Sequence, residues 1–193
     1  ARLAPPQGAR GDWIPPATQT VRTSPEIVAA FTHTLCVSYM ADIASALGRT
    51  AAASSYKSRL ASNRAAFDAH FWNGDRYDRP GSQAAQVFAL QVGAVPPARL
   101  NATLASLLAS FGPAASPHLD LGIFGTTFVF DVLRGNDMDD VGLRVLNETT
   151  YPSLGKMVEE GATTLWESWE GNRTHQVASR NHIMFGGGVN RFL

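Results

Sequence analysis

Apolar side chains recur at every fourth position between Ser24 and Gly48, and this spacing constrains the fold more than any other feature. The repeating positions are Ile27, Phe31, Leu35, Tyr39, Ile43 and Leu47. Residues spaced by four lie on one face of an α-helix, so the pattern predicts a helix with an apolar face. Ser24 and Pro25 suit the cap and the first turn of such a helix, and Gly48 is a typical terminator. We therefore expect a long helix that packs against other helices.

Five further segments have the same helical character and are separated by links that contain Pro or Gly. The expected ranges are 50–71, 82–92, 96–111, 123–133 and 139–146, and a less defined seventh segment begins near Ser179. Short strands fit only residues 75–78 and 163–165, where β-branched and aromatic residues lie between turns. The sequence therefore predicts an all-α fold of antiparallel helical hairpins. No residue motif recurs in each hairpin, which favours a helical barrel over a solenoid.

The composition fits a globular protein and excludes several classes of function. Apolar residues make up 45% of the 193 residues and charged residues 17%, with a net charge of zero. No run of basic residues marks a nucleic-acid groove, so we expect no nucleic-acid partner. No uninterrupted apolar stretch reaches the roughly 20 residues of a membrane span. Residues 1–6 lack the apolar core of a signal peptide, so we expect that one has been removed or that the native start lies elsewhere.

Cysteine and asparagine usage bears on the compartment. Cys36 is the only cysteine and falls inside the first apolar helix, which predicts a buried, unreactive thiol. Asn-x-Thr sequons occur at Asn101, Asn147 and Asn172, more than the roughly one expected by chance. They favour a secreted or extracellular glycoprotein, with chance as the alternative.

The titratable residues do not form a metal site in the sequence. Four histidines lie apart, with no carboxylate or thiol at ligand spacing: His33, His70, His118 and His175. The acids at Asp137, Asp139 and Asp140 lack the rest of a calcium-loop pattern and fit a solvated helix start. We therefore expect neither a metal nor another cofactor.

The segment Gly161–Trp169 is the most informative for function. It places Glu167 between the indoles of Trp166 and Trp169, and Asn181-His182 follows. An indole is a flat apolar surface with one N–H donor, which suits the C–H face of a sugar ring. A carboxylate beside it can deprotonate water if its pKa is suitable. The alternative is a pair of core tryptophans with an incidental acid between them.

This segment and four others resemble the α-L-rhamnosidases of glycoside hydrolase family seventy-eight. The matching segments are Gly11–Trp13, Gly81–Ala85, Leu121–Thr126, Tyr151–Trp169 and Ser179–Gly186. The first resembles the family's Gly-Asp-Trp loop, the second its Ser-Gln-Thr helix start and the last its Ser-x-Asn-His-x-x-x-Gly pattern. The resemblance extends over nearly the whole chain, and its last two segments together are specific.

The resemblance implies an (α/α)6 barrel that removes terminal α-L-rhamnose with inversion of configuration. Glu167 matches the general base that activates water, and His182 matches a histidine that contacts the sugar. Asp12 and Trp13 match loop residues that line the pocket. Together with the indoles of Trp166 and Trp169, these are the predicted substrate-binding residues.

The chain also departs from the family pattern. The family's general acid lies upstream of the Gly-Asp-Trp loop, and no acid in this chain matches its motif. Glu159, Glu160 and Glu170 are expected to be surface or supporting carboxylates. The spacing from Glu167 to His182 is shorter than usual, and residues 186–190 replace the usual Gly-x-Val-Gly-Glu-Trp pattern. We expect the family's final helix, and any β-sandwich that follows, to be absent.

A complete (α/α)6 barrel needs about twelve helices, whereas the sequence predicts six or seven. Residues 1–193 are therefore expected to be the C-terminal portion of a glycosidase catalytic domain without its N-terminal half. The chain would then be inactive alone and would pair with that half or with another chain. Two alternatives remain: a shortened relative that binds carbohydrate without cleaving it, and a helical interaction domain derived from such an enzyme.

Overall fold

The computed structural model describes residues 11–193 apart from residues 20, 79–80, 172–178 and 183–185. These residues form helices α1 (Pro25–Ala46), α2 (Thr50–Phe71), α3 (Gln83–Gln91), α4 (Pro97–Ser110), α5 (Ile123–Arg134), α6 (Asp139–Asn147), α7 (Leu154–Glu159) and α8 (Gly186–Phe192). The predicted all-α class is confirmed. Neither of the two predicted strands forms in the described residues, where one isolated bridge joins Trp72 and Tyr77.

Side-chain caps explain why several helices begin where they do. Ser24, Ser82 and Ser153 each accept a hydrogen bond from the backbone amide three residues later, at 3.3, 3.2 and 3.0 Å. The sequence analysis did not predict α7, a helix of six residues. α8 forms in the region of the seventh, less defined segment, in spite of its glycines. A Cβ at Gly188 would lie 2.5 Å from the carbonyl oxygen of Thr127, so glycine lets α8 pack closely on α5.

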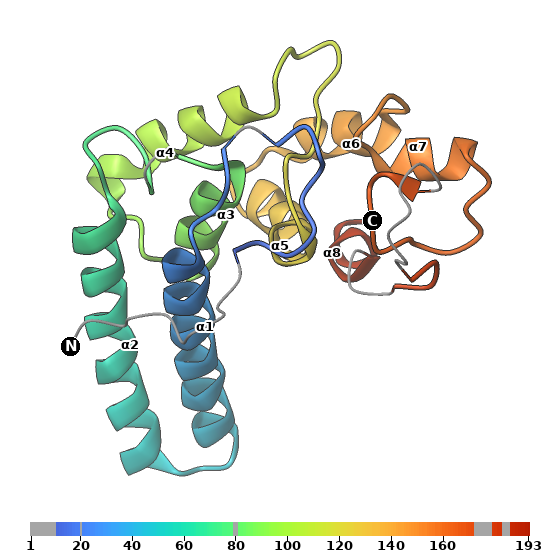
Figure 1. Ribbon diagram of the computed structural model, residues 1–193. Helices are drawn as coiled ribbons and strands as arrows, with labels where there is room; N and C mark the ends of the chain where they lie inside the picture. Colours follow the sequence, from blue (N-terminus) through green and yellow to red (C-terminus); the bar gives the residue numbers. More distant parts are fainter. Residues whose placement is uncertain (1–10, 20, 79–80, 172–178, 183–185) are drawn as a thin grey trace.

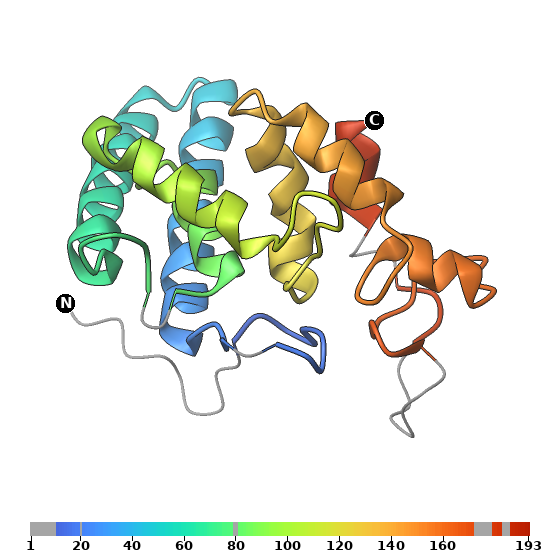
Figure 2. The same ribbon diagram turned by 90° about the horizontal axis from the view of Figure 1, so that it is seen from above.

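The helices form two layers of hairpins. α1, α3, α5 and α8 pack side by side in that order, and α2, α4 and α6 each pack on the helix that precedes them. Figures 1 and 2 show this arrangement, and in Figure 1 the hairpin of α1 and α2 extends beyond the rest of the molecule. Alternation of inner and outer helices is the layout of a barrel of hairpins. Residues 11–23 and the loop after α7 lie along the same side of it (Figure 2).

The core is centred on α3, in which every residue from Gln83 to Ala89 is buried. Phe88 of α3 stacks on Phe31 of α1, with ring centroids 4.3 Å apart. The buried amide of Gln86 exchanges two hydrogen bonds with the backbone of Tyr77, at 3.0 and 2.9 Å. Gln83 accepts from the amide of Asp120 at 2.9 Å. The segment that begins at Gly81 therefore ties the connecting loops to the core.

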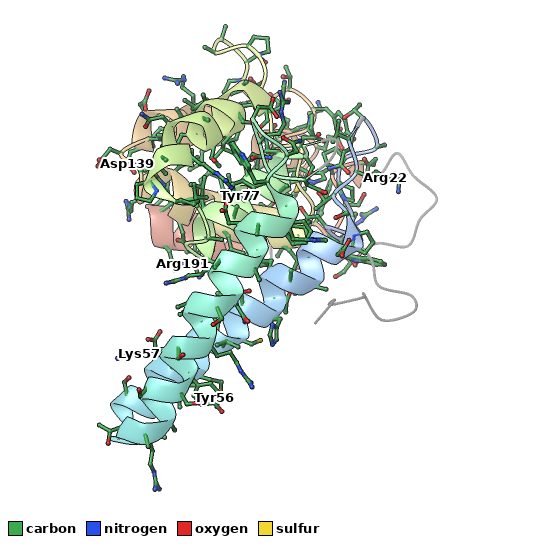
Figure 3. The ribbon with its side chains drawn as sticks, turned by 90° about the vertical axis from the view of Figure 1, so that its left-hand side faces the viewer. Arg22, Tyr56, Lys57, Tyr77, Asp139 and Arg191 are labelled. Carbon is green, nitrogen blue, oxygen red and sulfur yellow. The ribbon has the colours of Figure 1, made fainter. Side chains whose placement is uncertain are left out.

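The predicted apolar face of α1 is only half covered. Ile27 and Phe31 are buried, whereas Tyr39, Ile43 and Leu47 are 52%, 51% and 69% exposed. The reason is geometric: the second half of α1 extends with α2 beyond α3 and α5 (Figure 3). Cys36 lies at the start of that half and is exposed, so the prediction of a buried thiol is wrong.

By length and composition, α1 is the one helix in the described part of the chain that could cross a bilayer. The expectation of no such stretch rested on uninterrupted apolar runs, which α1 lacks. A core helix passes the same test, and the first half of α1 packs on α2 and α3 as a core helix does.

Candidate functional site

Glu167 lies in the loop after α7, held by a second segment of the chain. The amide of Glu167 donates to the carbonyl of Ser179 at 2.8 Å, and the amide of His182 donates to the carbonyl of Leu165 at 2.7 Å. The amide of Ser179 in turn donates to Oε2 of Glu167 at 2.8 Å. These backbone bonds orient the carboxylate without a regular strand. Residues 172–178, between the two segments, lie outside the described residues.

Trp13 and His182 flank this carboxylate. The indole N–H of Trp13 donates to Glu167, and His182 is close enough for its charge to act on the same group. The pKa of Glu167 is lowered, first by the Ser179 amide and then by Trp13 and His182, while slight burial opposes them. Three predicted site residues from opposite ends of the chain therefore converge. The result is an ionised, partly exposed carboxylate able to accept a proton.

Asp12 has a different environment from the one predicted. It is buried, and its carboxylate accepts hydrogen bonds from the amides of Gly122, Phe124 and Gly125, at 2.7, 2.9 and 3.1 Å. These amides belong to the first turn of α5, so Asp12 caps that helix from a distant loop. Burial raises the pKa of Asp12 to about 6, even though the three amides act in the opposite direction. In this structure Asp12 therefore anchors the loop that carries Trp13.

Glycines make the contact between this loop and α5 possible. The amide of Ile123 donates to the carbonyl of Trp13 at 2.8 Å. A Cβ on Gly122 would lie 2.2 Å from that carbonyl oxygen, and one on Gly125 would lie 2.6 Å from Oδ2 of Asp12. The two sequence segments are thus one structural unit. One feature of the sequence could have indicated this contact: α5 begins after Gly122, which has no side chain to cap the helix, so the cap must come from elsewhere.

Trp166 and Trp169 are buried between the core and the loop that carries Glu167. They are 5% and 3% exposed, so neither presents an open indole face to a sugar in this structure. The indole N–H of Trp169 donates to the carbonyl of Leu121 at 2.8 Å. A Cβ on Gly171 would lie 2.4 Å from the Trp166 ring, which shows how closely the loop folds over it. The two indoles therefore lie as expected for a pair of core tryptophans, whereas Glu167 between them is partly exposed.

Glu170 joins the loops on either side of the site, a role that sequence reasoning missed. Its carboxylate accepts from the amide of Ala17 at 2.7 Å, the hydroxyl of Tyr151 at 2.6 Å and the hydroxyl of Ser168 at 2.5 Å. Burial raises the pKa of Glu170, but these three bonds outweigh it and the net pKa is lowered. The carboxylate is thus occupied by protein donors. No local pattern signals this, because its partners come from three segments.

A cavity of about 760 Å³ lies beside Trp13. The lining residues are Gly11, Asp12, Trp13, Ile14, Pro15, Pro16, Ala17, Gln19, Arg22 and Glu170. Trp13 both lines the cavity and bonds to Glu167, so the two features adjoin. Within the described ranges, no group of three or more His, Cys, Asp or Glu side chains could hold a metal ion.

The predicted glycosylation sites differ in their surroundings. Asn101 and Asn147 are exposed, and Asn172 lies outside the described residues. In the first sequon the hydroxyl of Thr103 is buried and donates to the carbonyl of Arg99 at 2.9 Å within α4. The sequon at Asn147 lies at the end of α6, where Thr149 is exposed.

Residues 4–193 match the family described as the bacterial alpha-L-rhamnosidase 6 hairpin glycosidase domain. Over 190 residues the chain is 30% identical to an alpha-L-rhamnosidase from Streptomyces avermitilis, which corresponds to 95% of this chain and 18% of that protein. An alpha-L-rhamnosidase from Alteromonas sp. is 33% identical over 129 residues, or 63% of this chain and 14% of its own length.

Solved structures have the same fold. The alpha-L-rhamnosidase of Dictyoglumus thermophilum is 35% identical with a TM-score of 0.81, and the match covers 92% of this chain and 20% of that chain. The S. avermitilis enzyme, solved in complex with L-rhamnose, is 27% identical in the superposition with a TM-score of 0.81, over 94% of this chain and 18% of its own. The chain thus spans about a fifth of the length of these relatives.

Proposed function

The chain belongs to the six-hairpin glycosidase domain family of bacterial α-L-rhamnosidases, and on that premise we propose that it is part of an enzyme that hydrolyses terminal α-L-rhamnosides. The named relatives are α-L-rhamnosidases, and one was crystallised with L-rhamnose. The observation that carries the proposal is the convergence of Trp13 and His182 on the lowered-pKa carboxylate of Glu167. We assign the protein to glycoside hydrolase family seventy-eight on the segments that resemble it.

In the proposed mechanism Glu167 is the general base of an inverting reaction. Its carboxylate takes a proton from a water that attacks the anomeric carbon, while an acid protonates the departing oxygen. Inverting pairs are about 6.5–9.5 Å apart, which leaves room for that water. His182 is placed to contact a sugar hydroxyl and Trp13 to form one wall of the site. The acid belongs to a part of the parent protein outside this chain, so we expect the chain alone to be inactive.

The rest of the domain is the proposed partner of α1. Three hairpins are present among the described helices, whereas the family description specifies six. The exposed apolar residues of α1 are Tyr39, Met40, Ile43 and Leu47. Exposed apolar patches of this kind mark interaction surfaces. We propose that the missing N-terminal hairpins cover this face and that the chain is the C-terminal portion of the barrel.

That arrangement is tested by co-expressing this chain with the remainder of the parent domain as a separate polypeptide. We expect the two to co-purify, and Ile43→Ser to weaken the complex. Leu143→Ser, on the outer helix α6, is the matched control and should leave the complex intact. Self-association through the same face, detected by light scattering, would favour another copy as the partner instead.

The activity is tested by proton NMR of a chromogenic α-L-rhamnoside during hydrolysis by the full-length parent. An inverting enzyme releases β-L-rhamnose first, because water attacks the face opposite the departing group. Release of the α-anomer would overturn the inverting mechanism. Binding of rhamnose without hydrolysis by the parent would favour the carbohydrate-binding alternative, and absence of both would favour the helical interaction domain.

We further propose that the protein is secreted and that it is glycosylated at Asn147, the more accessible of the two sequons in the described part of the chain. This rests on the exposure of both Asn147 and Thr149 at the end of α6. Intact mass of the protein from its native source, before and after enzymatic deglycosylation, should differ. An unchanged mass would remove the glycoprotein assignment.

A further inference from the structure

The cavity beside Trp13 contains one charge that the proposed mechanism does not use. Arg22 lines this cavity and is exposed. Its side chain forms no ion pair or hydrogen bond with any residue in the described part of the chain. Figure 3 shows Arg22 at the loop side of the molecule, far from the hairpin end that carries Lys57.

Neither of the acids that line the cavity neutralises Arg22. The carboxylate of Asp12 is occupied by three backbone amides of α5. That of Glu170 is occupied by donors from Ala17, Tyr151 and Ser168. The guanidinium is therefore the uncommitted charge among the described lining residues.

The remaining walls restrict what can occupy the cavity. Residues 14–17 (Ile-Pro-Pro-Ala) supply an apolar wall next to the indole of Trp13. Gln19 also lines the cavity, but its amide nitrogen already donates to the carbonyl of Asp120 at 2.9 Å. An apolar cleft with one free guanidinium suits a group that has a flat apolar body and one anionic end. Arginine binds a planar carboxylate through two parallel hydrogen bonds.

The position of the cavity relates it to the sugar at Glu167. Trp13 forms a wall of the cavity and donates to Glu167, so a rhamnose held at Glu167 has the cavity as its neighbour. A volume of about 760 Å³ lies within the range for sites that hold small molecules of several rings. It therefore has room for the group attached to rhamnose.

We propose that Arg22 is a specificity-determining residue that binds a carboxylate on the aglycone, so that the preferred substrates are rhamnosides whose aglycone is a flat, apolar carboxylic acid. This inference rests on the proposed hydrolysis of rhamnosides. It assigns Arg22 a role in substrate choice and none in the bond-breaking step.

The test compares 4-carboxyphenyl α-L-rhamnoside with its methyl ester, using the full-length parent and its Arg22→Gln variant. The variant should lose about tenfold in kcat/KM on the carboxylate, the loss of one charge-assisted contact, and keep its activity on the ester. Comparing variant with wild type on each substrate cancels the difference in leaving-group acidity. Arg59→Gln, on the outer face of α2, is the matched control and should change neither value. The wild-type preference for the acid should also weaken at high salt.

Binding of the two glycosides, measured by calorimetry, separates this inference from the proposed function. Tighter binding of the acid by wild type but not by Arg22→Gln, without turnover of either compound, would retain the subsite and reject the hydrolase. Turnover with an unchanged acid-to-ester ratio in the variant would reject the subsite and retain the hydrolase. Equal losses on both substrates would show that Arg22 supports the loop, and would overturn the inference.

Discussion

Asp12 and Glu167 lie in two loops that Trp13 connects, and both carboxylates accept hydrogen bonds from main-chain amides. Asp12 receives three such bonds and Glu167 one from Ser179. Their pKa values nevertheless move in opposite directions, to about 6 for Asp12 and below the ordinary value for Glu167. The difference is burial, because a carboxylate removed from water loses more solvation than a few amides return. Amide bonds therefore do not by themselves identify a reactive acid.

The two loops consequently have different roles. The Asp12 loop is tied to α5 from inside and sets the position of Trp13. The Glu167 loop is supported by buried indoles from below and keeps its carboxylate open to solvent. Trp13 connects the loops through its carbonyl on one side and its indole N–H on the other. Loss of the Asp12 anchor should thus affect stability, whereas changes at Glu167 or at its hydrogen-bond donors should affect chemistry.

The largest expected effect is that of Glu167→Gln in the full-length parent. Gln retains the size of the side chain but cannot accept a proton from water, so rhamnoside hydrolysis should fall by at least about 10²–10⁴-fold. Release of a chromogenic aglycone measures the loss, and circular dichroism should show an unchanged fold. Near-normal turnover would remove Glu167 from the mechanism.

Asp12→Ala should instead destabilise the protein. The buried amides of Gly122, Phe124 and Gly125 lose their acceptor, at a cost on the order of 3 kcal/mol. The denaturant midpoint of the full-length protein, with hydrogen exchange of these three amides, measures the change. Asp75→Ala, in an exposed turn, is the matched control and should leave the denaturant midpoint unchanged. Equal stability of the two variants would show that Asp12 does not anchor the loop.

Trp13→Phe should move the acidic limb of the pH profile. The indole N–H stabilises the ionised form of Glu167, so its loss raises the pKa of that carboxyl. A base must be ionised to act, and the acidic limb of kcat/KM should therefore shift to higher pH. The control is Trp72→Phe, which lies at the end of α2 and should leave the limb in place. A limb that does not move in Trp13→Phe would mean that the indole bond has no influence on the base.

The smallest expected effect is that of Ser179→Ala. Ser179 acts on Glu167 through its backbone amide, which alanine keeps, so activity should stay within about twofold of wild type. Ser179→Pro removes that amide and should raise the pKa of Glu167, which moves the acidic limb in the same direction as Trp13→Phe. Loss of activity in the alanine variant would assign the hydroxyl a role that its contact with the Asn181 amide does not explain.

Several expectations from the sequence agree with the structure because they depend on neighbouring residues only. The starts of α1 and α3 follow from the capping residues Ser24 and Ser82 and from apolar spacing, which act within a few positions of the chain. The exposure of Cys36 and of the second half of α1 could not be predicted this way. Periodicity shows that a helix has an apolar face, but not whether another helix reaches far enough to cover it.

The sequence by itself determined the all-α class, the family resemblance and the identity of Trp13, Glu167 and His182 as residues to examine. Only the tertiary structure decided what each acid does. Asp12 became a helix cap and Glu170 a link between loops because the amides of Gly122 and Ala17 that they bind lie more than one hundred residues away along the chain. Solvation and long-range contacts decide whether a carboxylate is buried, hydrogen-bonded by protein donors or accessible to solvent. Neither can be predicted from the residues next to it in the sequence.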